Sequence, residues 1–259
     1  MLKIDIIDKT ERKIKFILEG VKPQFANAIR RISMGEITTM SVDSVDFTSN
    51  DSVLYDEILA HRLAMIPLVF NSKNYKIKES VEDTGSLYEV VLVVDKKGPC
   101  TVYSKDIKSS DPDVKPLYDN IPIVELTEGQ KLKFDATAIL GYGKNHSKWA
   151  AAVTSYRYYP IVKQDGKISN ETDVIKSCPK RALRIENGKV TVTEDCDLSG
   201  LCMQVAKPEG SLRVEGDPTK FIFTIESVSG LTAEQIMNMS LDELKAKAKD
   251  FSKSLSKLK

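Results

Sequence analysis

The sequence predicts an α+β fold, and two kinds of pattern lead to this prediction. Apolar residues recur at helical spacing in FANAIRRI (25–32), in DEILAHRLAMI (56–66) and in a long carboxyl-terminal segment. Most of the stretch from 41 to 146 instead alternates apolar and polar residues, which is typical of strands. A chain of 259 residues can bury sizeable cores and suits one to two ordinary domains.

The first helix is expected to begin after Pro23, because proline has its φ preset for a first helical turn. The apolar residues at three- and four-residue steps share one face: Val21, Phe25, Ala28, Ile29 and Ile32. Gly35 ends the segment. A helix face as apolar as this one must pack against another element.

Strand patterns lie on both sides of this helix. Residues 2–6 and 14–18 alternate in the same way, which predicts a hairpin with one buried face. Within the mostly β stretch from 41 to 146, the predicted helix over 56–66 stops at Pro67, because the residue before a proline is pushed out of the α region. Further on, residues 151–162 predict a strand that returns to the first sheet. SLRVEG and KFIFTIESV predict two strands paired across GDPT.

The last helix is expected to begin at Thr232, since Gln235 completes the spacing of a capping box. Its apolar seam consists of Met237, Leu241, Leu244, Ala248, Phe251, Leu255 and Leu258. A break near Ser240 is an open alternative. The pattern alone favours a helix packed within its own chain, whereas the regular seam also suits a helix that lies along another helix.

Composition excludes several classes of function. With 38 basic and 37 acidic residues the net charge is +1, which argues against a dedicated nucleic-acid sleeve. No apolar run is long enough to cross a membrane and no signal peptide is evident, so we expect a soluble, cytoplasmic protein. The sequence has no P-loop, no aspartate cluster for paired metal ions, and neither His61 nor His146 lies in a catalytic motif. Trp149 is expected to be a buried anchor, with an interface anchor as the alternative.

Three of the four cysteines carry the only cofactor signal. Cys178-Pro179 matches the end of a ferredoxin motif, and Cys196 and Cys202 match the start of a second one, with Ser199 at the middle ligand position. Three thiolates predict a [3Fe-4S] cluster, and a [4Fe-4S] cluster with an oxygen ligand is the second choice. The turn Asn187-Gly188 supports a small ferredoxin-like hairpin.

Other interpretations of these cysteines stay open. The three thiols are inert in one, and two of them form a disulfide in another. If a cluster is present, we expect it to have a structural role and not a redox role. An insert of about fifty residues has only a small core of its own, and the cluster would stabilise its fold. Cys100 is expected to be a small apolar residue.

Two long motifs carry a resemblance to a known family. NAIRR, followed by YDEILAHRLAMIPL, resembles the signature of the archaeal alpha-like (D-type) RNA polymerase subunits, which are similar to eukaryotic third-largest subunits and to the bacterial alpha amino-terminal domain. GYGKNHSKWAAAV (141–153) resembles that family's later lysine-tryptophan segment. The resemblance spans essentially the whole chain.

The resemblance implies a non-catalytic component of DNA-directed RNA polymerase that pairs with a smaller alpha-like subunit, called L in archaea. Residues 1–40, 147–164 and 211–259 would form the dimerisation domain, 41–146 an inserted mostly β domain, and 165–210 the ferredoxin-like iron-sulfur insert. The inserted domain would meet the large catalytic subunits and the small subunits N and P, without sequence-specific DNA binding.

The same resemblance implies the contact residues. The apolar pairing surface would comprise Phe25, Ala28, Ile29 and Ile32 with Met237, Leu241, Leu244, Phe251 and Leu255. The polar contacts to the large subunits would come from Arg30, Arg31, Asp56, Glu57, His61 and Arg62. The alternative function, a ferredoxin-like electron-transfer component of a redox enzyme, accounts for only about fifty residues.

Overall fold

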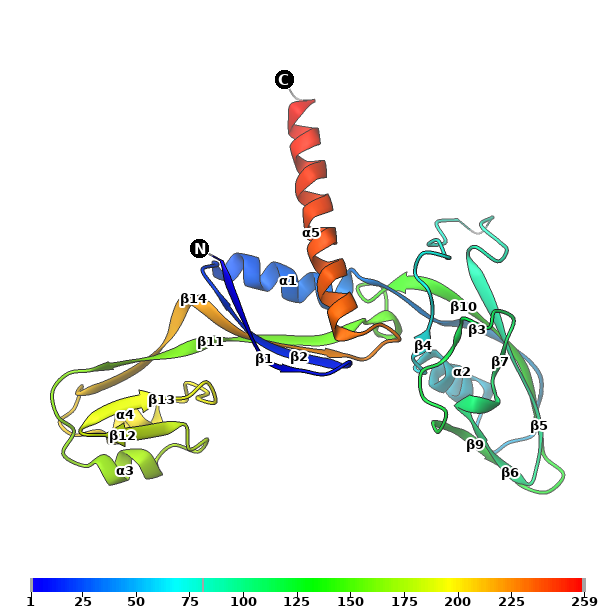
Figure 1. Cartoon of the computed structure of the whole chain (residues 1–259). Helices are drawn as coiled ribbons and strands as arrows, with labels where there is room; N and C mark the ends of the chain where they lie inside the picture. The colour runs from blue at the N-terminus through cyan, green and yellow to red at the C-terminus, as the bar shows by residue number, and fades with distance from the viewer. Residues whose placement is uncertain (1, 81, 258–259) are drawn as a thin grey trace. The chain divides into compact units, whose positions relative to one another are not determined.

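The computed structural model describes residues 2–80 and 82–257 and confirms an α+β fold (Figure 1). The chain forms two compact units, each built from separate stretches of sequence. Unit 1 comprises Met1–Lys9, Ile14–Asn27 and Ser155–Thr224, and unit 2 comprises Thr10–Lys13, Ala28–Thr154 and Ile225–Lys259.

The main sheet of unit 1 has the strand order β1-β2-β14-β11. The bounds are β1 Lys3–Lys9, β2 Lys13–Glu19, β11 Ala152–Gln164 and β14 Leu212–Ser227. Phe16 of β2 stacks on Phe223 of β14 with ring centroids 5.3 Å apart, and Tyr156 of β11 lies 5.3 Å from the same Phe223 ring. Aromatic packing across three strands therefore forms the core of this sheet.

The first hairpin differs from the prediction of one buried face. β1 and β2 pair as expected, with Ile4 opposite Leu18 and Ile6 opposite Phe16. Leu18 and Phe16 are buried, but every residue of β1 is exposed, including Ile4 at 50% and Ile6 at 61%. Directly opposed residues share a face of the sheet, so the core face continues onto β1, where no described residue buries it.

The predicted strand pair across GDPT is wrong, because β14 is one continuous strand through this sequence. Gly216 explains the difference: a Cβ atom there would lie 2.5 Å from the Cβ of Tyr158. The glycine thus makes room for the Tyr158 side chain of the neighbouring strand and makes no turn. Asp217 accepts a hydrogen bond from the Thr219 amide and satisfies the local backbone.

Unit 1 also contains a small insert. Its elements are α3 Glu171–Lys176, β12 Leu183–Glu186, β13 Lys189–Val192 and α4 Leu201–Val205. β12 and β13 form a hairpin with Ile185 opposite Val190. The turn residues Asn187 and Gly188 have φ of 52° and 75°, as a tight hairpin of this twist requires, so the predicted turn is confirmed.

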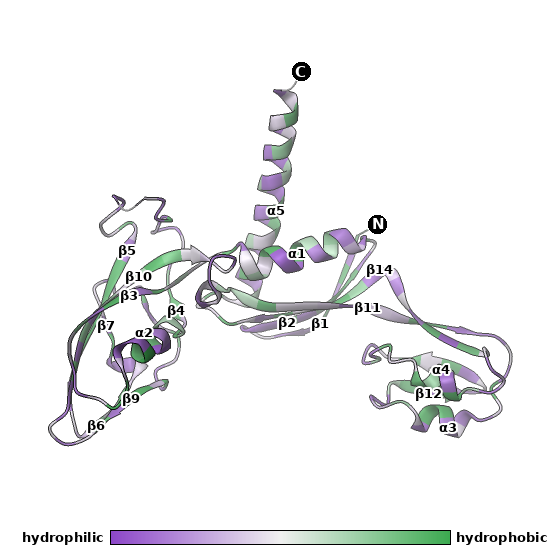
Figure 2. Ribbon diagram, turned by 180° about the vertical axis from the view of Figure 1, so that it is seen from behind, coloured by the Kyte–Doolittle hydropathy of each residue, from purple (hydrophilic) through white to green (hydrophobic). Residues whose placement is uncertain are grey.

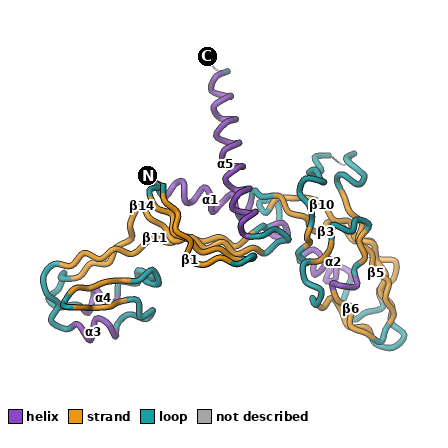
Figure 3. The backbone as a smooth tube through the Cα atoms, viewed as in Figure 1, coloured by secondary structure: helices purple, strands orange, loops and turns teal. Residues whose placement is uncertain are grey.

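Unit 2 is built on a second sheet of order β3-β10-β5-β7, in which β10 pairs with β3 and with β5 along nearly its whole length (Figure 3). The strands of this unit are β3 Thr38–Asn50, β4 Leu68–Val69, β5 Glu89–Lys97, β6 Cys100–Tyr103, β7 Lys108–Ser109, β8 Lys115–Pro116, β9 Pro122–Leu126 and β10 Lys131–Tyr142. Two 3-10 turns are η1 Ser104–Asp106 and η2 Ser147–Trp149. Strand β9 pairs with β6.

The helices occur close to where the sequence predicts them. α1 spans Pro23–Gly35, α2 spans Asp56–Ala64 and α5 spans Ala233–Ser256. The capping box of α5 is confirmed: Thr232 Oγ1 accepts from the Gln235 amide, and Gln235 accepts from the Thr232 amide. α5 continues through Ser240, whose hydroxyl donates to the Ile236 carbonyl at 2.6 Å. None of the described helices is both long enough and apolar enough to cross a membrane.

Candidate subunit-contact surface

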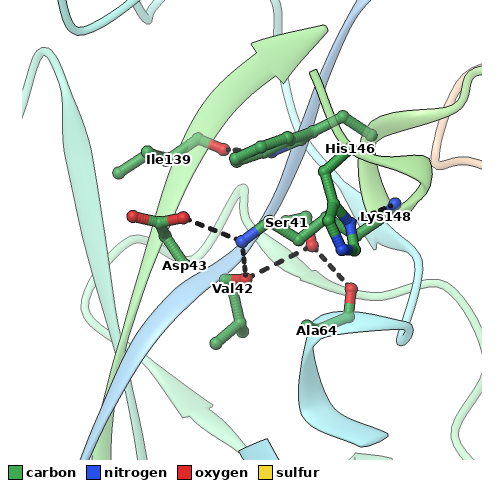
Figure 4. Close-up of polar contacts among 8 residues, drawn as sticks. Ser41, Val42, Asp43, Ala64, Ile139, His146 and Lys148 are labelled. Atoms are coloured by element: carbon green, nitrogen blue, oxygen red, sulfur yellow. Dashed lines mark hydrogen bonds and ion pairs between the residues drawn. The ribbon is translucent and has the colours of Figure 1, made fainter. Parts of the chain in front are cut away.

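Residues close to the start of β3 (Thr38–Asn50), namely Thr39–Asp43, hold two other segments of unit 2 in place, and we call them the β3 anchor. Figure 4 shows the contacts of Ser41, Val42 and Asp43. Ser41 Oγ donates to the carbonyl of Ala64, the last residue of α2, at 2.6 Å. Thr39 Oγ1 donates to the carbonyl of Trp149 at 2.8 Å. A helix leaves its last carbonyls without partners, so the first of these bonds caps α2 and fixes its end against the sheet.

Lys148 makes the second connection of the β3 anchor. Its ammonium lies 2.8 Å from Asp43 Oδ1 and 3.1 Å from the Val42 carbonyl oxygen, and 4.1 Å from the centroid of the Trp149 ring. Only 10% of the Lys148 side chain is exposed, against 44% for Asp43. A cation this buried needs partners, and here a carboxylate, a carbonyl and an aromatic face supply them.

Trp149 is a buried anchor, as the sequence indicates. Its Nε1 donates to the Ile139 carbonyl at 3.2 Å, and its ring is nearly perpendicular to that of His146, with centroids 6.4 Å apart. A Cβ on Gly141 would lie 2.4 Å from the indole, so only glycine fits beneath it. The lysine-tryptophan segment therefore locks the 143–150 loop onto β3 and β10.

α2 presents polar and apolar side chains to solvent. Its buried residues are Leu59 and Leu63. The four predicted contact residues Asp56, Glu57, His61 and Arg62 are all exposed. Large apolar side chains lie exposed on or beside the helix: Val53, Tyr55, Ile58 and Met65. Arg62 also donates to the Pro122 carbonyl at 2.6 Å, next to a cavity of about 240 Å³ that both residues line.

α1 contributes fewer exposed residues than the sequence predicts. Ile29 and Ile32 are buried within the chain itself, so they pack at home. Phe25 is 37% exposed, Ala28 is half-buried, and Arg31 is exposed. The exposed neighbours, not the two isoleucines, are available for a contact surface on this helix.

α5 is mostly uncovered. Its buried residues are Ala233, Ile236 and Ser240, all in the first two turns. Along the predicted seam Met237 and Leu244 are half-buried, whereas Leu241, Phe251 and Leu255 are exposed by 38%, 67% and 49%. Figure 2 shows hydrophobic residues recurring along this helix. Leu258, the last residue of the predicted seam, lies outside the described residues.

The three cysteines of the predicted cluster come together in the insert of unit 1. Cys196 and Cys202 belong to one hydrophobic cluster, and Cys178 packs against it. All four cysteines are free thiols, so the disulfide alternative does not apply. Burial raises the pKa of the Cys202 thiol, and the nearby Cys196 adds to that rise, so the neutral form is favoured.

Comparison with known proteins defines the class. A family model described as the RNA polymerase Rpb3/RpoA insert domain matches residues 37–157. Residues 37–157 are therefore similar to the insert domain that the alpha-like class of polymerase subunits carries.

Full-length relatives define the family. The DNA-directed RNA polymerase subunit Rpo3 of Pyrococcus furiosus is 41% identical over 99% of this chain and 98% of its own length. Those of Pyrococcus horikoshii and Thermococcus kodakarensis are 42% and 38% identical, each over 100% of this chain and 99% of the relative. The chain belongs to the Rpo3 family of DNA-directed RNA polymerase subunits, which confirms the resemblance seen in the two motifs.

The iron-sulfur prediction is wrong. Among residues 2–80 and 82–257 no group of three or more His, Cys, Asp or Glu side chains could hold a metal ion. The relatives are named as polymerase subunits, and no iron-sulfur protein is among those names. The physical reason is that Cys178, Cys196 and Cys202 serve as packing residues of a small apolar core. Neither the [3Fe-4S] nor the [4Fe-4S] cluster, nor the electron-transfer function built on them, is supported.

Sequence reasoning missed several exposed apolar residues. Alternation predicts burial of Ile4 and Ile6, but it does not show which strand of a hairpin is covered. Val53 and Tyr55 precede α2 and do not belong to its helical spacing, so no periodic pattern in the sequence marks them.

Replacing Lys148 tests the β3 anchor. Lys148→Met keeps the length of the side chain but leaves the Val42 carbonyl and Asp43 without their cation. We expect the free energy of unfolding to fall by about 1–3 kcal/mol. Trp149, the single tryptophan, allows urea unfolding to be followed by fluorescence. Lys144→Met, at an exposed position of the same loop, should change the midpoint little, and equal midpoints for the two variants would contradict the anchor.

Replacing Cys202 tests its role as a packing residue. Cys202→Ser buries a hydroxyl in the apolar cluster, so the insert should lose about 1–3 kcal/mol of stability. Cys100→Ser, at a half-exposed position, is the matched control and should cost less. Hydrogen exchange resolved by residue measures both. A visible absorption band of iron bound to sulfur that the Cys202 variant loses would contradict the packing role.

Proposed function

We propose that this chain is a non-catalytic assembly component of DNA-directed RNA polymerase. It pairs with the alpha-like partner L, and the pair presents a composite surface to the large catalytic subunits and to the small subunits N and P, in the cytoplasm. The observation that carries the proposal is the uncovered apolar seam of α5.

The length of α5 makes that seam hard to explain in a lone chain. Its 24 residues extend over about 36 Å at 1.5 Å per residue. After Ser240 no described residue of the helix is buried. Burying a side chain such as Leu or Phe contributes about 1.5–3 kcal/mol. Leu241, Phe251 and Leu255 together thus offer a partner several kcal/mol that this chain alone leaves unused.

Exposed apolar residues of unit 1 support a pairing role as well. Ile4 and Ile6 extend the core face of the sheet beyond β2, and Phe25 is partly exposed on the first turns of α1. An open apolar sheet edge is a liability in a monomer, because it invites association with other chains. A partner that covers it converts the liability into a specific contact.

We assign the proposed contacts to separate segments of the chain. Residues 1–40, 147–164 and 211–259 form the pairing domain, and 165–210 form a small insert within it. Residues 41–146 form the domain that meets the other subunits. In this scheme the polar side chains of α1 and α2 give specificity to the contacts with the large subunits: Arg30, Arg31, Asp56, Glu57, His61 and Arg62.

The proposal predicts which α5 residues matter for pairing. Phe251→Asp combined with Leu255→Asp places two charges on the seam, so the affinity for a co-expressed L partner should fall by more than about 100-fold. Because both side chains are exposed, the circular dichroism melt of the lone chain should not change. Size-exclusion chromatography of the co-expressed pair measures the loss.

The matched control is Ser252→Asp, which adds a charge at an exposed polar position of the same helix and should pair normally. A double variant that co-elutes with L as the unaltered chain does would show that α5 is not the pairing surface.

A further inference from the structure

A cavity at the carboxyl end of α1 is a feature of unit 2 that the proposed pairing through α5 does not use. It has a volume of about 470 Å³ and lies between the end of the helix and the 143–150 loop. Its lining residues are Arg30, Arg31, Met34, Gly35, Glu36, Gly143, Lys144, Ser147 and Ala150. We call it the α1-end pocket.

The walls of this pocket are held by backbone contacts. The Lys144 amide donates to the Gly35 carbonyl at 2.9 Å, so the loop is seated directly on the helix end. A Cβ on Gly143 would lie 2.4 Å from the Met34 carbonyl oxygen and 3.1 Å from the Cα of Ala150. Only glycine allows this approach, and the β3 anchor holds the other end of the loop through Lys148 and Trp149. The pocket is therefore preformed.

The charges around the pocket are unequal. Arg31 and Lys144 are exposed at its rim, and Arg30 is half-buried beside Met34. Glu36 is the one acidic residue among the described lining residues, and it forms an ion pair with Lys247 of α5. Because Lys247 offsets the charge of Glu36, the rim cations Arg31 and Lys144 are left in excess.

The lining is also largely apolar apart from these charges. Met34, Ala150 and two glycines form surface suited to an aliphatic stem. A glutamate or aspartate side chain combines such a stem with a carboxylate that arginine binds through two parallel hydrogen bonds. A nucleic-acid backbone would instead call for an extended basic stripe, and the chain has a net charge of only +1.

We propose that the α1-end pocket binds a carboxylate side chain from an acidic segment of another polymerase subunit, with Arg31 and Lys144 as its direct partners. This inference rests on the proposed assembly function. Lys247 acts as a positioning residue, since it keeps Glu36 from competing for the two cations. α5 thereby links two contacts: a partner that holds α5 in place also keeps the pocket cationic.

The first test is zero-length cross-linking of the assembled polymerase, purified through a tag on this chain. A carbodiimide joins a lysine amine to a carboxylate in contact with it, and peptide mass spectrometry identifies the two residues. We expect Lys144 to be linked to an aspartate or glutamate of another subunit. Lys144→Arg should abolish the link while it retains the subunit, because arginine keeps the charge but forms no amide.

The second test measures how firmly that subunit is held. Arg31→Glu with Lys144→Glu should lower its retention in a salt-wash series by about 10-fold or more, and Lys247→Ala by a smaller factor. Lys73→Glu, an exposed charge reversal outside the pocket, should have no effect.

Three results would overturn the proposal, and they are distinguishable. If the double variant retains the cross-linked subunit as the unaltered chain does, with the polymerase intact, the pocket is not a binding site, and the assembly function is unaffected. Cross-links from Lys144 to nucleic acid, and to no protein, would assign the pocket to another class of ligand. If the unaltered chain brings down no polymerase subunit at all, the assembly function itself fails.

Discussion

The structure of unit 2 depends on one buried cation at the start of β3. Lys148 can be buried only because Asp43, the Val42 carbonyl and the Trp149 ring surround it, and this requirement fixes the 143–150 loop in a single position. A neighbouring bond from Ser41 fixes the end of α2 on the same strand. Two surface segments far apart in sequence thus take their positions from five consecutive strand residues.

That arrangement gives fixed positions to side chains that we propose contact other subunits. The end of α2 is fixed on the sheet, so its exposed charged and apolar side chains have defined positions. The 143–150 loop is fixed as well, and it forms a wall of the α1-end pocket. α5 differs, because only its first turns are buried and the rest extends as an apolar seam. Rigid contact sites and one uncovered helix are what an assembly platform requires, since binding a preformed surface costs little conformational entropy.

Much of the fold could be predicted from local patterns. The capping box of Thr232 and Gln235 and the Asn187-Gly188 turn are local signals, and both occur as predicted. Gly216 was misjudged because its role depends on Tyr158 of another strand, which no local pattern shows. The cysteines were misjudged for a related reason: ferredoxin-like spacing describes possible ligands, whereas their packing in an apolar core depends on tertiary structure. Contact surfaces were predicted by resemblance, but periodicity could not separate exposed from buried apolar residues.

The most direct test of the account is the native mass of the complex that this chain forms when it is isolated, tagged, from its own host under gentle conditions. We expect one copy of the chain with one copy of a small alpha-like subunit, alone or within the whole polymerase. A mass equal to the lone chain, or to two copies of this chain without a smaller partner, would contradict the central claim that α5 is completed by a different subunit.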